Sequence, residues 1–427
     1  MTIISNAYPT NMPNSQEVSQ GGPANFARIF YNHIAAATDH RWVGVMYQIN
    51  AGRRSRLEKC FSFPHRDYFK IYIPQNLVRQ LTRAEKKSDP VLILKAVIDR
   101  TAALLKKEKA DVVFLNGFGI FNWVLLKAAE KTDTPAVIQH AGIWTKELNL
   151  HKEFYSPAGL RTMIGMEKDS SRLTAAEVFL NTWSRDYYRR HVARREDGAT
   201  VIIPLPFNFS GFAELGGKNK RSYGDKRTFK IGTIGRWDKI KNHAAFLALA
   251  REAKKAGLNW RFYAVTHIPD TPQEEKKKEI YGNYINIIPS LDRKGVAALC
   301  RSLDLLILPS RFDVSPTVVL EAMALKTPIV ISPNVGFVND FRASGAKNWI
   351  VDFNNSAAAL KAVKKLAGKP MPSALKTRLI TKHDYQRVFS SYLDLFSAII
   401  IKSKSGKAVW QTLVPMPLKS MSSLPKR

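Results

Sequence analysis

The stretch DLLILPSRFDVSPTVVLEAMALKTPIVIS, residues 304–332, decides the fold that we expect for this chain. Its first part, 304–308, is Asp304 followed by an unbroken apolar run, which is typical of a parallel strand buried on both faces. Ser315 and Pro316 then form a helix start, with Ser as the N-cap and Pro at the first helical position. The helix is expected to end at about Leu325, so the stretch predicts a strand, a turn and a helix of an open α/β sheet.

The turn between this strand and this helix is the first candidate site. Ser315 and Thr317 lie at the helix start, where unpaired backbone N–H groups and the helix dipole favour an anion. Asp313 stands in the turn, and Glu321 lies on the same helix face as Thr317, with its side chain tilted back toward the turn. Acids beside a phosphate site need sugar hydroxyls as donors, so the pattern indicates a nucleotide sugar. The alternative is a plain βαβ unit whose acids face water.

The spacing of these acids resembles a known signature. Asp313, seven further residues and Glu321, followed by 322–324 and 327–330, resemble the E-x7-E motif of the retaining GT-B glycosyltransferases of the GT4 group. The resemblance implies that the first acid binds the transferred sugar, the second binds the ribose, and intervening amides hold the diphosphate. Two positions depart from the family pattern, because Asp313 replaces a longer Glu and Lys326 replaces a common Gly. A left-handed backbone at Lys326 would cost roughly 1 kcal/mol, which is tolerable.

A second element of the chain indicates the same donor. The expected strand 229–234 ends at Gly235, and Arg236 is followed five residues later by Lys241. This spacing resembles the GT4 element whose Arg and Lys clasp the donor diphosphate. Arg supplies a planar fork and Lys a point charge, which together suit a diphosphate. Such a pair is common by accident, but its family-like separation from the acid motif argues against accident.

The first half of the chain carries weaker candidates. Gly21 and Gly22 precede an expected helix over 24–37, and GT4 members carry a similar pair here, where the backbone can approach a ligand closely. His140 follows the expected strand 135–139, and ligands of open α/β sheets bind at the carboxyl ends of strands. The resemblance implies that His140 approaches the donor sugar and the reaction centre. The alternatives are an ordinary turn for the glycines and a core position for the histidine.

We expect two Rossmann-like, doubly wound α/β domains that face each other across a cleft, which is the GT-B arrangement. In chain order the expected parts are an acceptor-side domain, a linker, a nucleotide-sugar-binding domain, a helix that crosses back to the first domain by analogy, and a basic tail. Their bounds are 1–207, 208–228, 229–382, 383–401 and 402–427. Further strands are expected at 2–5, 43–47, 111–115, 178–184, 260–265, 284–288 and 349–351.

Composition bounds the class of protein. With 427 residues and 45% hydrophobic content, the chain is long enough for two full cores. Cys60 and Cys300 are too few and too far apart for a disulfide framework or a metal site. No signal peptide or spanning segment is expected, so we expect a cytoplasmic protein, or one that is peripheral on the inner face of a membrane.

The charge balance indicates a polyanionic partner. Lys and Arg number 66 against 35 Asp and Glu, a formal net charge of +31. An anionic membrane surface or a nucleic acid would suit such a protein, but no nucleic-acid reader motif is found, so no nucleic acid is expected. A generally basic proteome is the alternative explanation.

The resemblance implies a retaining glycosyltransferase of the hexosyltransferase type, EC 2.4, that moves a sugar from a UDP- or GDP-sugar to a glycan or lipid-linked acceptor in polysaccharide biosynthesis. No cofactor and no metal are expected, because Arg236, Lys241 and the helix amides can neutralise the leaving diphosphate. One rival is a GT-B protein that binds a nucleotide sugar with degenerate activity, which Asp313 makes conceivable. A basic nucleic-acid-binding protein is the other rival. The sequence does not identify the sugar, the base or the acceptor.

Overall fold

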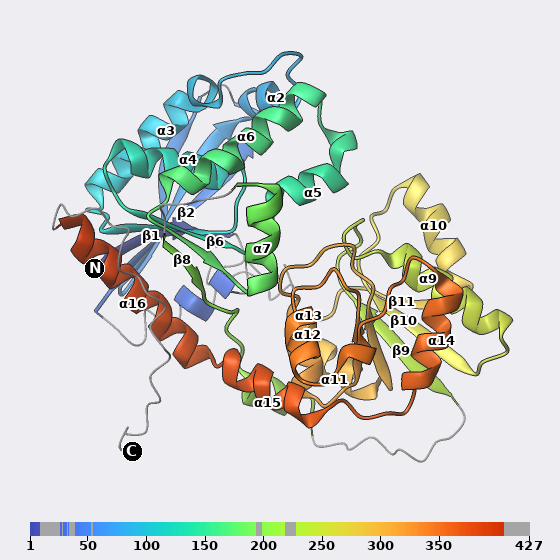
Figure 1. Cartoon of the computed structure of the whole chain (residues 1–427). Coiled ribbons are helices and arrows are strands. Elements are labelled where there is room, and N and C mark those ends of the chain that lie inside the picture. Colours follow the sequence, from blue (N-terminus) through green and yellow to red (C-terminus); the bar gives the residue numbers. More distant parts are fainter. Residues whose placement is uncertain are drawn as a thin grey trace, which may run out of the picture.

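The computed structural model describes residues 1–8, 26–27, 29–31, 33, 39–52, 54–193, 199–217 and 228–404. The chain forms two α/β domains, each built around its own sheet (Figure 1). The N-terminal sheet has eight strands in the order β3-β4-β2-β1-β5-β6-β7-β8, and the C-terminal sheet has five in the order β11-β10-β9-β12-β13. Two doubly wound domains were expected from the sequence, and the structure confirms them.

The N-terminal sheet is parallel except for the edge pair β3–β4, which is antiparallel. Every residue of β5 and β6 is buried, because their apolar runs meet helices on both faces of the sheet. The strands are β1 (Thr2–Asn6), β2 (Arg41–Asn50), β3 (Arg56–Phe63), β4 (Arg66–Pro74), β5 (Val112–Asn116), β6 (Ala136–His140), β7 (Ala176–Phe179) and β8 (Ala199–Ile202).

Helices of the N-terminal domain begin at clear capping signals. Asp89 caps α3 by accepting the N–H of Val91 at 2.8 Å, and Ser156 caps α6 by accepting the N–H of Gly159 at 3.0 Å. A proline at the first helical position follows each cap. The helices are α2 (Gln75–Thr82), α3 (Pro90–Lys107), α4 (Ile120–Lys131), α5 (Trp144–Leu150), η2 (Lys152–Phe154), α6 (Pro157–Leu173) and α7 (Thr182–His191). One core cluster joins α3, α4 and α6 to one face of the sheet, and another joins α7 to the opposite face.

All strand pairs of the C-terminal sheet are parallel. Its strands are β9 (Phe229–Ile234), β10 (Trp260–Val265), β11 (Ile285–Ile288), β12 (Leu305–Leu308) and β13 (Ile329–Ile331). The helices are α8 (Phe209–Leu215), α9 (His243–Lys255), α10 (Pro272–Gly282), α11 (Arg293–Ser302), α12 (Thr317–Ala324), α13 (Val338–Ala343), η3 (Lys347–Trp349), α14 (Ser356–Leu366) and α15 (Ser373–Lys382). A single apolar core cluster connects the sheet to these helices.

The last helix, α16 (Tyr385–Lys404), returns from the C-terminal domain to the N-terminal one, as was expected (Figure 1). Tyr392 donates its hydroxyl to the Gln139 side chain on β6. Phe396 packs against Phe114 of β5, with ring centroids 5.4 Å apart. Aromatic packing therefore fixes α16 on the face of the N-terminal sheet that α7 also covers.

Four segments differ from the expectation. The expected strand 178–184 ends at Phe179 as part of β7, and α7 begins at Thr182. The expected linker 208–228 contains α8, whose Phe212 is 1% exposed within the C-terminal core, because apolar residues at helical spacing make this segment amphipathic. The expected strand 349–351 is reduced to one bridge between Ile331 and Ile350. The antiparallel hairpin of β3 and β4 was not expected at all. Among the helices of the described ranges, none combines the length and the apolarity that a bilayer crossing requires.

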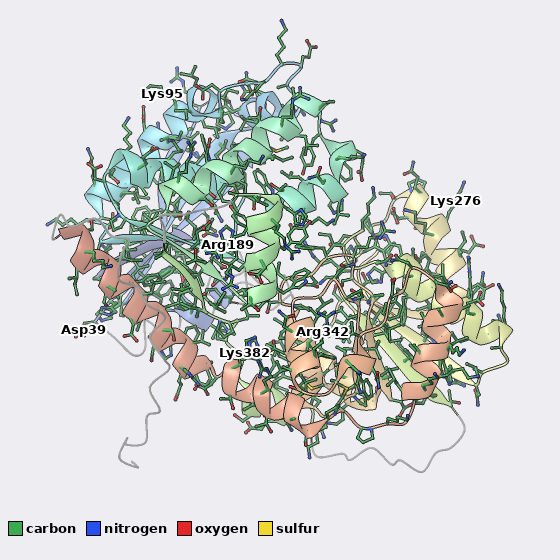
Figure 2. All side chains as sticks on the ribbon, in the orientation of Figure 1. Asp39, Lys95, Arg189, Lys276, Arg342 and Lys382 are labelled. Atoms are coloured by element: carbon green, nitrogen blue, oxygen red, sulfur yellow. The ribbon has the colours of Figure 1, made fainter. Side chains whose placement is uncertain are left out.

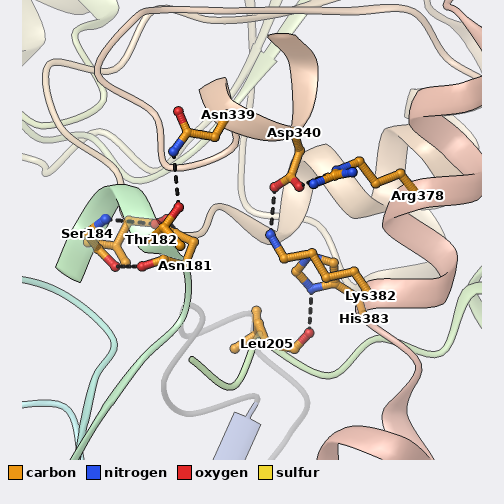
Figure 3. Close-up of polar contacts among 10 residues, drawn as sticks. Asn181, Thr182, Ser184, Leu205, Asn339, Asp340, Arg378, Lys382 and His383 are labelled. Atoms are coloured by element: carbon orange, nitrogen blue, oxygen red, sulfur yellow. Dashed lines mark hydrogen bonds and ion pairs between the residues drawn. The ribbon is translucent and has the colours of Figure 1, made fainter. Parts of the chain in front are cut away.

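The two chain crossings between the domains run side by side (Figure 3). Phe207 donates its N–H to the carbonyl of His383 at 2.8 Å, and His383 Nδ1 lies 2.7 Å from the Leu205 carbonyl oxygen. Burial lowers the pKa of His383 to about 4, so its ring is neutral and Nδ1–H donates. A second contact joins the domains where Asn339 donates to the Thr182 hydroxyl at 3.1 Å. The crossings thus form a hydrogen-bonded hinge.

A charged cluster supports the C-terminal side of this hinge (Figure 3). Asp340 on α13 is 2% exposed and accepts from Arg378 and Lys382 on α15, each at 2.8 Å. A buried carboxylate needs such partners to remain charged. The cluster therefore fixes α15, from which the chain turns back toward the N-terminal domain.

Candidate active site

Two loops at the carboxyl edge of the C-terminal sheet form the centre of the candidate site. One loop, 235–242, follows β9, and the other, 309–316, follows β12. They are neighbours because β9 and β12 are paired in parallel. Arg311 also donates its backbone N–H to the carbonyl of Ile240 at 2.8 Å. Ligands of open α/β sheets bind at this edge.

An ion pair connects two of the predicted site residues across these loops. Lys241 Nζ donates to the Asp313 carboxylate, and their side chains are only 18% and 14% exposed. Backbone bonds hold Asp313 in place, since its N–H donates to Asn334 O at 3.0 Å and its carbonyl accepts from Gly336 N at 2.8 Å. The structure therefore brings the expected phosphate-binding cation and the expected sugar-binding acid into direct contact.

Arg236 lies in the same loop and is the more open of the two cations. Its side chain is 68% exposed, and its Nη2 lies 3.2 Å from Asp238 Oδ2. The other oxygen of Asp238 accepts the backbone N–H of Lys241 at 2.9 Å. His243 Nε2 lies 2.9 Å from the Arg236 carbonyl, which helps to fix the loop. Each cation of the loop thus has a carboxylate beside it, and an anionic ligand could take the place of either carboxylate.

Glu321 lies on α12, eight residues after Asp313, and is partly buried. Burial raises the pKa of its carboxyl to about 7, although the charge of Arg293 and a hydrogen bond from the Thr317 hydroxyl act in the opposite direction. Thr317 and Glu321 are one helical turn apart, which explains their contact. The hydroxyl of Thr317 is therefore engaged with Glu321.

The start of α12 differs from the expectation for Ser315. Pro316 occupies the N-cap position with an extended backbone, and no side chain caps the helix. The Ser315 hydroxyl oxygen is buried and has no hydrogen-bond partner among the described residues. Proline at the N-cap moves the helix start one residue onward, so Ser315 remains in the loop. Buried hydroxyls usually find a partner, so this one is available to a ligand.

Two further buried hydroxyls at this sheet edge have no partner within the described parts of the chain. They belong to Thr266, which follows β10, and to Ser310, which follows β12. With Ser315 they surround the end of β9, because β9 lies between β10 and β12. The sequence reasoning missed Thr266 and Ser310. The strand-end rule that selected His140 would have found both.

His140 ends β6 of the N-terminal sheet, and its side chain was expected to approach the donor sugar. The side chain instead lies inside the N-terminal domain. It is fully buried, and its Nε2 lies 3.1 Å from Glu177 Oε1. Its ring stacks on Phe179 at 4.5 Å and contacts Tyr188 at 4.3 Å. The buried Glu177 on the neighbouring strand β7 draws the ring into the domain interior, so the structure does not bring His140 to Asp313 or Glu321. The other candidates of this domain, Gly21 and Gly22, lie outside the described residues.

The segment after β6 connects the N-terminal domain to the loop 235–242, which we call the donor loop. Lys239 Nζ lies 2.5 Å from Glu153 Oε1, an ion pair between the domains. Glu147 of α5 is near enough to the loop for Arg236 and Asp313 to affect its pKa. No motif in the sequence marks Glu147, because its neighbours come from the other domain. Among the described residues, no group of three His, Cys, Asp or Glu side chains could hold a metal ion.

The candidate site lies in a part of the chain that matches a known protein family. Residues 218–382 match the family described as Glycosyl transferases group 1. A curated relative, "Putative glycosyltransferase EpsF" of Bacillus subtilis (strain 168), is 26% identical over 105 residues, which are 25% of this chain and 27% of that protein. The chain therefore spans about a quarter of the length of this relative.

Solved structures resemble nearly the whole chain. A sucrose-phosphate synthase from Thermosynechococcus elongatus is 14% identical with a TM-score of 0.70, and the match covers 94% of this chain and 100% of that one. A UDP-forming α,α-trehalose-phosphate synthase from Burkholderia xenovorans, in complex with glucose-6-phosphate, is 12% identical with a TM-score of 0.65 and coverages of 93% and 99%. At such low identity these likenesses establish the fold. The chain has the GT-B fold, and together with the group 1 match of its second domain this supports a glycosyltransferase.

Proposed function

We propose that this chain transfers a sugar from a UDP- or GDP-sugar to a glycan or lipid-linked acceptor, with retention of anomeric configuration and without a bound metal ion. The observation that carries the proposal is the contact between Lys241 and Asp313 at the carboxyl edge of the second sheet. It places a cation suited to phosphate beside an acid suited to sugar hydroxyls. The spacing of Asp313 and Glu321, which resembles that of the GT4 group, supports the retaining outcome.

Donor binding would proceed by an exchange of partners. The diphosphate takes Lys241 and Arg236, and the unpartnered hydroxyl of Ser315 donates to a phosphate oxygen. Asp313 then loses its lysine partner and accepts hydrogen bonds from hydroxyls of the transferred sugar. Glu321 accepts from the ribose hydroxyls, which favours its ionised form over the neutral form that burial favours.

The transfer itself breaks the bond between the anomeric carbon and the diphosphate oxygen and forms a bond from the acceptor oxygen to the same carbon. The proton of the acceptor hydroxyl leaves with the nucleoside diphosphate. Two cations beside the diphosphate stabilise the charge that develops on the leaving group, which is the largest single contribution in many such reactions. Arg236 and Lys241 therefore have the role that a metal ion has in other transferases.

An anionic membrane surface is the proposed location of the acceptor, at the cytoplasmic face. Basic side chains extend over both domains, with Lys95 on α3 and Lys276 on α10 at separate outer surfaces (Figure 2). On the β3–β4 hairpin, Phe61 is 39% exposed, and the Arg56 guanidinium lies 4.1 Å from the centre of the Tyr72 ring. Aromatic and basic groups together suit the lipid interface, where each cation contributes about 1 kcal/mol.

The test is a panel of UDP-, GDP- and ADP-sugars with thermal shift and donor hydrolysis as readouts, in the presence and absence of EDTA. We expect one nucleotide class to raise the melting temperature and its sugar to be released, with EDTA having no effect. Binding without release of sugar in any acceptor mixture would favour the rival of a binding protein with degenerate activity. Absence of nucleotide binding across the panel would overturn the proposal.

A further inference from the structure

The carboxylate of Glu147 lies near the carboxyl end of β6 in the N-terminal sheet. It belongs to α5, which begins four residues after β6 ends. A Cβ atom built on Gly142 would lie 2.3 Å from Glu147 Oε1, so the carboxylate is folded back against the loop at the carboxyl end of β6. Only glycine leaves room for this position. The chain therefore places an acid where ligands of the N-terminal sheet bind.

This acid also faces the donor loop of the other domain. Figure 1 shows α5 on the side of the N-terminal domain that faces the C-terminal domain. The ion pair of Glu153 with Lys239, at 2.5 Å, brings the end of the same segment to the loop that carries Arg236. The charges of Arg236 and Asp313 both act on the Glu147 carboxyl. Glu147 thus lies between the N-terminal sheet edge and the donor site.

The fold does not use the Glu147 carboxylate. Within the described residues no group donates a hydrogen bond to it, although its side chain is only partly exposed. Glu167 provides the contrast, because its carboxylate accepts the backbone N–H groups of Trp144 and Thr145 and so holds the start of α5. A carboxylate with limited solvent and no donor is costly unless a ligand provides one. Its position is therefore better explained by a ligand than by the fold.

We propose that Glu147 is an acceptor-binding residue whose carboxylate takes a hydrogen bond from a hydroxyl of an uncharged acceptor sugar, opposite the donor sugar at Asp313. This inference rests on the proposed function. Glu147 comes from the domain that does not hold the donor, so it meets the acceptor. A carboxylate repels phosphate, so Glu147 disfavours a sugar phosphate as acceptor. In this respect the chain would differ from the Burkholderia synthase that is in complex with glucose-6-phosphate.

The protonation state of Glu147 adds a readout. Burial raises the pKa of its carboxyl to about 7, with Glu167, Asp313 and Asp238 acting in the same direction and Arg236 in the opposite one. The ionised form is the stronger hydrogen-bond acceptor, since the protonated form carries a proton on one oxygen, so acceptor binding should improve as the pH rises through this value. The pKa of Glu321 lies in the same range, but Glu321 is proposed to bind the donor. At a saturating donor concentration, the pH dependence of the acceptor KM therefore reports on Glu147.

The experiment compares wild type, Glu147→Gln, Gly142→Ala and Glu153→Gln in transfer from the best UDP- or GDP-sugar to glucose and to glucose 6-phosphate. Glu147→Gln should lower kcat/KM for glucose on the order of 10- to 100-fold through a higher acceptor KM. Binding of UDP or GDP should change by less than about 2-fold, since no phosphate contact is lost. Gly142→Ala should have the same effect, because the added methyl group displaces the carboxylate.

Glu153→Gln is the matched control, because it removes an acid from the same segment but breaks only an exposed ion pair, which contributes little to stability. It should leave transfer to glucose unchanged. The preference for glucose over glucose 6-phosphate should narrow in Glu147→Gln and Gly142→Ala but not in Glu153→Gln. An active wild type whose acceptor KM, acceptor preference and pH profile are all unaltered by Glu147→Gln overturns the inference. Equal losses of nucleotide affinity and transfer also overturn it, since Glu147 would then support the donor site. If wild type binds no nucleotide, the proposed function fails and the inference fails with it.

Discussion

Replacement of Asp313 by Ala should tighten the binding of a nucleoside diphosphate while it abolishes most transfer. In the structure, Lys241 donates to Asp313, and both side chains are mostly shielded from solvent. A diphosphate must therefore take Lys241 away from an existing partner. The substitution removes that competition, and it leaves the loop in place because backbone bonds to Asn334 and Gly336 hold residue 313.

The size of the effect follows from the bond that is exchanged. A hydrogen bond between charged groups contributes about 1.5 to 3 kcal/mol, but part of this is recovered when Asp313 meets the sugar or solvent. We expect a net gain of about 1.4 kcal/mol, which is a 10-fold lower Kd for UDP or GDP. Transfer should fall, because the sugar hydroxyls lose their acceptor.

Calorimetric titration of UDP and GDP into wild type, Asp313→Ala, Lys241→Ala and the double variant measures this. Lys241→Ala should weaken binding, and Asp313→Ala should have no further effect in the Lys241→Ala background. An unchanged or raised Kd in Asp313→Ala would refute the exchange of partners, because the carboxylate would then not compete with phosphate for Lys241.

Other variants and conditions give further tests. Arg236→Ala should raise the Kd for UDP or GDP about 5- to 10-fold and leave the binding of uridine or guanosine unchanged, as measured by titration; equal losses for both would indicate a collapsed site. Asp313→Glu should change the preferred sugar or the rate of transfer in a donor panel, and wild-type behaviour with every donor would make Asp313 a structural acid. Because burial raises the pKa of Glu321 from 4.5 to about 7, the native state binds more protons than the unfolded one in this window, and stability should fall by up to roughly 3 kcal/mol as the pH rises through it. Thermal melts of Glu321→Gln should show a smaller fall, because Glu147, whose pKa is also raised to about 7, still contributes to it. The same variant should lose most transfer. Vesicles with anionic lipid should bind the protein at low salt and release it at high salt, whereas a preference for nucleic acid over lipid at physiological salt would contradict the membrane proposal.

Much of the fold could be predicted because local signals agree with it. The run at 305–308 is a strand in the structure, as its unbroken apolar sequence indicated, and the strand expected at 229–234 is also present. The backbone after α12 is left-handed at Lys326, with a φ of 59°, which is the case whose cost was judged tolerable from the sequence. Such features depend on residues close in sequence, so a sequence pattern is enough to indicate them.

The hairpin β3–β4 could not be predicted because the cationic side chains of β3 pack on aromatic rings of β4. Arg56 lies over Tyr72, and Lys59 lies 5.8 Å from the centre of the Phe69 ring. In the sequence these cations break the alternation that marks a strand, and the segment reads as a solvated face. The aromatic rings that the cations cover become neighbours only after the strands have paired.

The grouping of the candidate site residues could be predicted only where one domain supplies them. Arg236, Lys241, Asp313 and Glu321 belong to two adjacent loops and a helix, so their spacing along the chain carries the information. His140 was misplaced because the strand-end rule does not say to which side of the sheet a ring turns, and Glu177 on the next strand decides that. Glu147 of the first domain has charged neighbours in the second domain that are about 90 to 170 residues away in the chain, beyond any local pattern.

The shorter acid at position 313 is consistent with a site that neutralises itself before the donor arrives. Asp reaches one methylene less than Glu, so its contact with Lys241 requires the two loops to lie close together, and the bond from Arg311 to Ile240 holds them there at 2.8 Å. While Lys241 and Asp313 are paired, Lys241 is not available to the diphosphate and Asp313 is not available to the sugar hydroxyls. A diphosphate that takes Lys241 releases Asp313 for the sugar, whereas a free sugar has no charge with which to displace the lysine. In the proposed function, recognition of the sugar would therefore depend on recognition of the nucleotide, and we expect a free hexose to compete poorly with a nucleotide sugar for this site.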